Sequence, residues 1–193
     1  MRCRPLVIAT VLVALIPATQ AQAAPAADAA RAKSFAIRAS GGLAGSVTRI
    51  GAFRPRRDPT IRAAQRVFGR PSSRKLGRYG ACTVDWRRLR LTIYFENFGG
   101  HGPGQTTCTS SVGKAQSVVF RGSRFKTWRN LRVGDSSNTI VERHPSAEFL
   151  DRRWWLTFAV SPFGDESEYA SLYATVSNGR VNAMKGWIGA AGE

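Results

Sequence analysis

Histidine is scarce in this chain, and that scarcity limits its chemistry. The 193 residues include two histidines, His101 and His144, which lie far apart. A catalytic zinc site usually needs three protein ligands. Glu142 and His144 are two residues apart, a spacing that does not place both side chains on one helix face. The glycine-rich segment 99–104 does not open a helix as a phosphate-binding loop would. The sequence therefore predicts no metal site and no cofactor.

The chain also lacks the Gly-x-Ser-x-Gly motif that presents a catalytic serine at a sharp turn. His101 is a candidate general base, although no nucleophile is marked for it. Paired carboxylates can hydrolyse glycosides, and the segment Asp165–Glu168 contains Asp165, Glu166 and Glu168. We expect that segment to be a solvated loop. A small secreted hydrolase using His101 or Asp165–Glu168 is thus the alternative interpretation, and no catalytic residue is assigned.

Long apolar runs are absent too. The longest, Leu6–Ile16, has about eleven residues, whereas a membrane-spanning helix needs about 20. It follows Arg2 and Arg4 and precedes Ala21-Gln22-Ala23. A basic start, a short apolar run and a small-x-small site are typical of a secretory signal peptide. We expect residues 1–23 to be cleaved near Ala23–Ala24 and the remaining protein to be secreted.

Cysteine is nearly absent from the exported part of the chain. Cleavage removes Cys3 and leaves Cys82 and Cys108. Exported proteins meet oxidising conditions, which favour a bridge between the two. The bridge closes a loop of about 25 residues and contributes roughly 3 kcal/mol in the chain-entropy model. Two free buried thiols are the alternative.

Acidic residues are few, and the excess of basic over acidic residues is distributed unevenly along the chain. The chain has 29 Lys and Arg against 12 Asp and Glu, a net charge of +17. Thirteen of the basic residues and two acids lie between Arg49 and Arg90, whereas positions 91–193 have eleven and nine. The positive field therefore belongs to the first half.

That field is the strongest functional indication in the sequence. The predicted anion- or partner-binding residues share this basic segment: Arg62, Arg66, Arg70, Arg74, Arg78, Arg87 and Arg88. We expect a non-enzymatic binding module that contacts an anionic cell-envelope polymer or a secreted protein partner. Nucleic acid is a less suitable partner for an exported protein. The alternative is a solvated arginine-rich surface that binds no ligand.

Local patterns predict two short helices. Asp58-Pro59-Thr60 can cap a helix whose Ile61, Ala64 and Phe68 face a core, and Gly69 and Pro71 end it. A second helix is expected from about Ser136 to Arg143. His144 then sits at its end, where a cation interacts well with the helix dipole.

Alternating apolar residues predict strands between and after these helices. The expected strands are 89–95, 115–120, 153–158, 172–176 and 181–188, and Asn178-Gly179 favours a tight hairpin between the last two. The Ala- and Gly-rich segment 24–46 is expected to be a flexible leader. Residues 47–193 are then a single α+β domain of short helices packed on an antiparallel sheet, built as two tandem helix-plus-hairpin repeats, 58–120 and 128–190.

Tryptophan is plentiful by comparison, with five residues. Trp154 and Trp155 are adjacent, so a strand would point them to opposite faces. One is expected in the core, and the other is a candidate for stacking on a sugar or anchoring a partner. The alternative is that both are covered.

Two short motifs resemble a known group. Leu131-Arg132-Val133-Gly134-Asp135 before a short helix, and the closing segment Leu172–Trp187 with its Asn-Gly turn, are similar to the small secreted domains of the β-lactamase-inhibitor and BamE-like group. More broadly, the chain resembles exported actinobacterial proteins of unassigned function. The resemblance implies a helical pair on an antiparallel sheet, often in tandem, and a non-catalytic role. It departs in having cysteines for one disulfide rather than one in each repeat, and no inhibitory loop is matched.

Overall fold

The computed structural model describes residues 34–97, 99, 102–163 and 167–189, which belong to one compact unit. The helical elements are α2 (Ile61–Phe68), the 3-10 turn η1 (Arg87–Leu89) and α3 (Asn138–Arg143). The strands are β1 (Phe35–Ala39), β2 (Gly42–Leu43), β3 (Val47–Ile50), β4 (Ser73–Leu76), β5 (Cys82–Trp86), β6 (Leu91–Glu96), β7 (Lys114–Phe120), β8 (Phe125–Thr127), β9 (Glu148–Leu150), β10 (Arg153–Val160), β11 (Glu168–Ser177) and β12 (Arg180–Trp187). No helix among these residues is both long and apolar enough to span a membrane.

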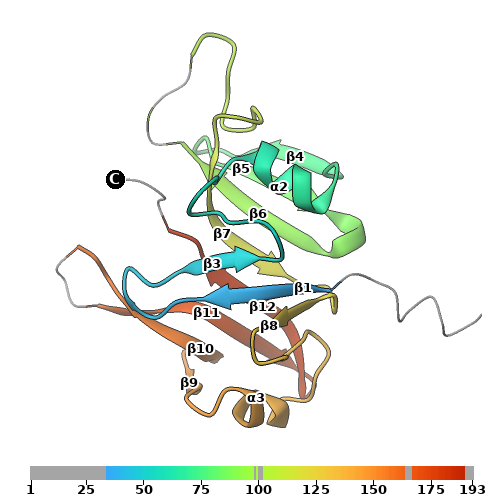
Figure 1. The fold of residues 1–193 in the computed structure, drawn as a ribbon, viewed down its shortest axis with the longest axis vertical. Helices are drawn as coiled ribbons and strands as arrows, with labels where there is room; N and C mark the ends of the chain where they lie inside the picture. Colours follow the sequence, from blue (N-terminus) through green and yellow to red (C-terminus); the bar gives the residue numbers. More distant parts are fainter. Residues whose placement is uncertain (1–33, 98, 100–101, 164–166, 190–193) are drawn as a thin grey trace, which may run out of the picture. The chain divides into compact units, whose positions relative to one another are not determined.

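The strands form one large sheet and one small sheet. The large sheet has nine strands in the order β2-β10-β11-β12-β7-β6-β5-β4, with β9 paired to β10 (Figure 1). The small sheet has the order β3-β1-β8. All pairings are antiparallel except β1 with β8 and β2 with β10. The parallel pairings tie the N-terminal strands to segments that are distant in the sequence.

An aromatic cluster joins the small sheet, α2 and the large sheet. Phe68 of α2 makes edge-to-face contacts with Phe35, Phe53 and Trp86 at centroid distances of 5.4, 5.8 and 5.6 Å. Phe35 also stacks on Phe125 of β8 at 5.3 Å. Such pairs contribute about 0.5–1.5 kcal/mol each beyond the burial of their area. One face of the large sheet is therefore covered by the core.

The structure confirms the two predicted helices and their boundaries closely. Thr60 caps α2, because its side chain accepts a hydrogen bond from the Ala63 amide at 3.2 Å. Gly69 ends the helix with a φ of 82°, a conformation that glycine adopts without steric cost. The buried side chains of α2 include Ile61, Ala64 and Phe68, as the spacing predicts.

The α+β prediction is wrong, because the protein is mostly β. Strands make up 46% and helices 11% of the described structure. The helices have eight and six residues, and α3 buries only Ile140. Two helices this short cannot form a layer over nine strands, so the small sheet supplies much of the cover. A helical pair lying on the sheet, as the resemblance implies, is not what is found.

The predicted flexible leader is wrong over its second part. Residues 24–33 lie outside the described residues, but 35–43 contain β1 and β2. Phe35 and Ile37 are buried, whereas Ala36 and Arg38 are exposed. This two-residue alternation is that of a half-buried strand, and it places β1 at the centre of the small sheet.

The segments 58–120 and 128–190 share an order of elements, although it is not a helix plus a hairpin. Each contains one helix followed by four antiparallel strands, α2 with β4–β7 and α3 with β9–β12. Their last strands, β7 and β12, pair with each other and join the two meanders into one sheet (Figure 1).

Candidate functional site

The second face of the large sheet carries a row of side chains that are direct partners across six strands. Each residue of this row is the register partner of the next. In the order β5, β6, β7, β12, β11 and β10, they are Asp85, Thr92, Val119, Lys185, Tyr173 and Trp155. A second row, beside the first on the same face, contains Thr83, Tyr94, Ser117 and Trp187. We call these two rows the open face. Much of it lines a hollow of about 1060 Å³, together with the loop after β10.

Aromatic side chains dominate the open face. Tyr94, Trp155, Tyr173 and Trp187 come from four strands and all line the hollow. Trp187 is 47% exposed. The ring of Tyr173 lies between two cations, with the Arg153 guanidinium 5.0 Å and the Lys185 ammonium 6.0 Å from its centroid. These cation–π contacts hold the ring in place and leave a preorganised, mixed apolar and polar surface.

Two residues of the lining have a buried side-chain N–H group with no acceptor among the described residues. The groups are Gln116 Nε2 and Trp155 Nε1, and Gln116 is only 3% exposed. The Gln116 backbone is satisfied, since its carbonyl accepts a hydrogen bond from the Ile188 amide at 2.7 Å. A buried donor without a partner costs about 1–3 kcal/mol.

The hollow carries no excess charge. Its basic and acidic side chains are Arg56, Arg153 and Lys185 against Glu96, Asp151 and Glu168. Tyr169, also in the lining, donates a hydrogen bond to the Gly45 carbonyl at 2.7 Å, and burial raises its pKa. The described lining of this hollow is thus aromatic and electrically balanced, unlike the basic surface expected from the sequence.

The seven predicted arginines are all exposed, and the structure distributes them over several elements. Arg62 and Arg74 meet at one loop, because the Arg62 amide donates to the Ser110 carbonyl at 2.9 Å and the Arg74 guanidinium to the Ser110 hydroxyl at 3.0 Å. Arg87, on η1, lines a separate hollow of about 360 Å³ with Arg90 and Arg121.

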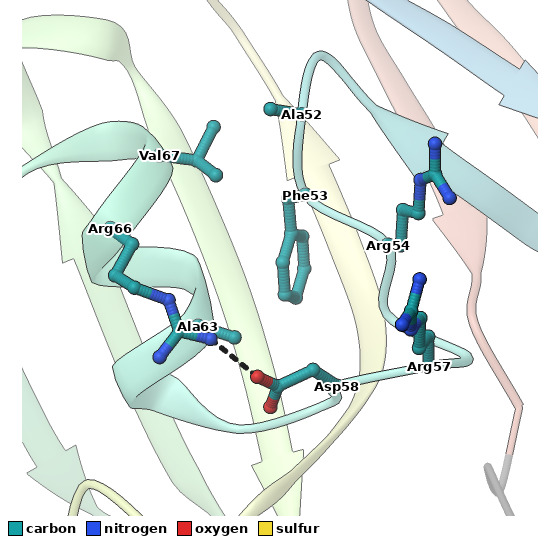
Figure 2. A pocket seen from close by; sticks show the side chains of 8 residues that line it. All are labelled: Ala52, Phe53, Arg54, Arg57, Asp58, Ala63, Arg66 and Val67. Atoms are coloured by element: carbon teal, nitrogen blue, oxygen red, sulfur yellow. Dashed lines mark hydrogen bonds and ion pairs between the residues drawn. The ribbon is translucent and has the colours of Figure 1, made fainter.

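A third hollow, of about 410 Å³, brings one predicted arginine together with two that the sequence did not single out. Arg66 of α2 lines it together with Arg54 and Arg57 of the preceding loop (Figure 2). Arg66 forms an ion pair with Asp58 at 2.5 Å. Burial alone would raise the pKa of Asp58, but hydrogen bonds from Thr60 and Arg66 outweigh it and keep that pKa below its ordinary value.

The two adjacent tryptophans point to opposite faces, as predicted. Trp154 is the register partner of the buried Ala174, packs against the core and lies 5.4 Å from the Phe149 ring. Trp155 lies on the open face opposite Tyr173. The other members of the open face were missed, although the spacings Tyr173–Thr175 and Lys185–Trp187 show the strand alternation that could have found them.

The structure describes two of the five remaining residues that the sequence analysis considered. His101, Asp165 and Glu166 lie outside the described residues, and Glu168 begins β11 on the surface. His144 is not a solvated cation at a helix end. It is 1% exposed and shares a hydrogen bond with Thr127 Oγ1 at 2.8 Å. Burial, aided by the charge of Arg129, lowers its pKa to about 4, so it is neutral at pH 7.

Cys82 and Cys108 form a disulfide, which confirms the predicted pairing. It ties the buried start of β5 to the loop before β7. Comparison with protein-family models, curated proteins and solved structures gives no match to this chain. The resemblance to the β-lactamase-inhibitor and BamE-like group therefore stays a prediction.

Proposed function

We propose that the chain is an exported, non-enzymatic binding module and that the open face holds a protein partner. The observation that carries the proposal is the hollow in which aromatic side chains from four strands, Tyr94, Trp155, Tyr173 and Trp187, gather on one face of the large sheet. Rigid aromatic anchors beside desolvated polar groups are characteristic of the energetically dominant centre of protein interfaces. Among the described residues, neither histidine nor cysteine lines the hollow.

The surroundings of the hollow favour a protein over a charged polymer. Leu43 and Phe163 are 74% and 80% exposed, and Phe163 and Ala44 both belong to the rim. Exposed apolar side chains beside a concave surface commonly mark a protein interface. Because the charges of the lining balance, a polyanion would gain little there. Export rests on the predicted signal peptide, and the disulfide is compatible with it.

The test compares aromatic side chains on and off the open face. The mature protein, immobilised, is exposed to the culture medium and envelope extract of the producing cells in 0.5 M salt, which suppresses purely electrostatic association. The affinity of each retained protein is then measured for Tyr173→Ala, Trp187→Ala and the control Tyr79→Ala. Tyr79 is 92% exposed in the turn between β4 and β5.

We expect each open-face variant to bind a specific partner with an affinity lowered at least about tenfold, the usual loss at an interface hot spot. Tyr79→Ala should bind that partner as the parent does. Hydrogen exchange in the complex should show protection of β11 and β12. Equal binding by all three variants, or no protein retained at 0.5 M salt, would contradict the proposal.

A further inference from the structure

The hollow between α2 and the loop before it differs from the open face in both charge and construction. Phe53, Ala63 and Val67 form its apolar part, and Arg66 borders it on the helix side. Arg54 and Arg57 border it on the loop, and their side chains extend from the loop on the side away from α2 (Figure 2). Asp58 is the only acid that lines it in the described structure. The net charge of the lining is therefore positive.

The loop that carries Arg54 and Arg57 is anchored at its base. Phe53 is 2% exposed and packs against Phe68 at a centroid distance of 5.8 Å. The Arg54 carbonyl accepts hydrogen bonds from both the Arg57 and the Asp58 amides, each at 3.0 Å. A turn closed in this way fixes the backbone of both arginines, which reduces the entropy lost when their side chains bind an anion.

The two loop arginines keep their charges available. Asp58 is already engaged by Arg66 and by the Thr60 hydroxyl, which donates to it at 2.8 Å. Within the described residues, the guanidinium groups of Arg54 and Arg57 have no hydrogen-bond or ion-pair partner. Arg56, between them in sequence, turns elsewhere and donates to the Ala44 carbonyl. The pair Arg54 and Arg57 thus forms an unneutralised cationic surface on the outer side of this loop (Figure 2).

We infer that the outer side of this loop, with Arg54 and Arg57, binds the phosphate groups of a phosphodiester polymer. Guanidinium groups form paired hydrogen bonds to phosphate oxygens. The two non-bridging oxygens of a phosphodiester can each accept more than one hydrogen bond, so two neighbouring guanidinium groups can bind one phosphate together. Arg62 and Arg70 extend the exposed positive surface along and beyond α2, so successive phosphates of a polymer would find further cations. This inference does not depend on the open face.

The test compares two pairs of exposed arginines with equal charge. A labelled glycerol phosphate oligomer is titrated with the parent, with Arg54→Gln/Arg57→Gln, and with the control Arg87→Gln/Arg88→Gln, at several salt concentrations. We expect the first variant to bind at least about tenfold more weakly and the slope of log affinity against log salt to fall by about 2. The control should stay within about threefold of the parent, and Tyr173→Ala should bind as the parent does.

Binding measurements with other ligands identify the source of the phosphate and can overturn the inference. A thymidine oligomer of equal charge separates a nucleic acid from a polyol phosphate, since whichever binds more tightly names the better ligand. Inorganic phosphate should compete only weakly. Equal weakening by both arginine pairs would show diffuse attraction without a site. Equally tight binding of polyglutamate would refute phosphate recognition, and so would an absence of binding at low salt.

Discussion

The segments 58–120 and 128–190 have the same order of elements but are held together by different chemistry. In the first, α2 has a side-chain cap and contributes four buried residues, and a disulfide fastens β5 to the loop before β7. In the second, α3 has no side-chain cap and buries only Ile140. Its end is held by the hydrogen bond between the buried His144 and Thr127. A shared topology thus rests on packing and a covalent link in one half and on a neutral imidazole in the other.

The surfaces of the two halves differ in the same way. The first half exposes arginines, and several have no partner in the described structure. The second half supplies Trp155, Tyr173, Lys185 and Trp187 to the open face. A sheet that is continuous across both halves can therefore present a cationic region and an aromatic region without either disturbing the other. We expect the two surfaces to be separable by mutation.

The largest expected effect tests the packing of the two helices. Phe68→Ala removes a ring that contacts four other aromatic rings, and we expect it to lower the free energy of unfolding by about 3–5 kcal/mol. Ile140→Ala, the matched change in α3, should cost less, about 2–3 kcal/mol. Urea denaturation at pH 7 measures both. If the two variants lose equal stability, the contrast between the helices is wrong.

Reduction of the disulfide should have the next largest effect. The bridge spans 26 residues of sequence, so its loss should lower the free energy of unfolding by roughly 3 kcal/mol in the chain-entropy model. Denaturation with and without reductant gives the value, and Cys82→Ala/Cys108→Ala is the control that should not respond to reductant. Hydrogen exchange should quicken more in β5 and β7 than in β10 and β11. Uniform quickening would mean that the bridge does not act on its own half.

Acid should weaken the second half through His144. Its pKa is about 4 in the folded protein and 6.5 in the unfolded chain. The unfolded chain therefore binds the proton first as the pH falls, and stability is lost between about pH 6.5 and pH 4. The loss between pH 7 and pH 5 should be about 2 kcal/mol. His144→Gln should be less stable at pH 7 but show a smaller change between these pH values. A variant with the parent's pH dependence would exclude His144 as the cause.

Local signals in the sequence predicted the features that local chemistry determines. The caps of α2, Thr60 and Gly69, lie within ten residues of each other, and the Asn178-Gly179 turn needs only its own two residues, whose φ values are 51° and 70°. The disulfide prediction followed from the expected cleavage of a signal peptide, which would leave two cysteines, Cys82 and Cys108. Each of these predictions required no knowledge of distant strands.

The open face could not be predicted in the same way, because it depends on long-range pairing. Tyr94 and Trp187 share a row only because β7 lies between β6 and β12, which brings residues more than ninety positions apart together. The small sheet depends on a parallel pairing of β1 with β8 across a similar separation. The mostly β character was underestimated because strands such as β2 and β4 have two and four residues, too few to show a clear alternation.

The smallest expected effect compares the starts of the two helices. Thr60→Ala removes the side-chain oxygen that accepts from the Ala63 amide, and losing such a cap costs about 1 kcal/mol. Ser137 occupies the same position before α3 but makes no side-chain capping bond, so Ser137→Ala should change stability by less than about 0.5 kcal/mol. Paired denaturation curves at pH 7 resolve this difference. Because α3 lacks a cap that could be lost, equal losses at both positions would show that the two helices begin alike, and the asymmetry between the halves would then be confined to the core and the disulfide.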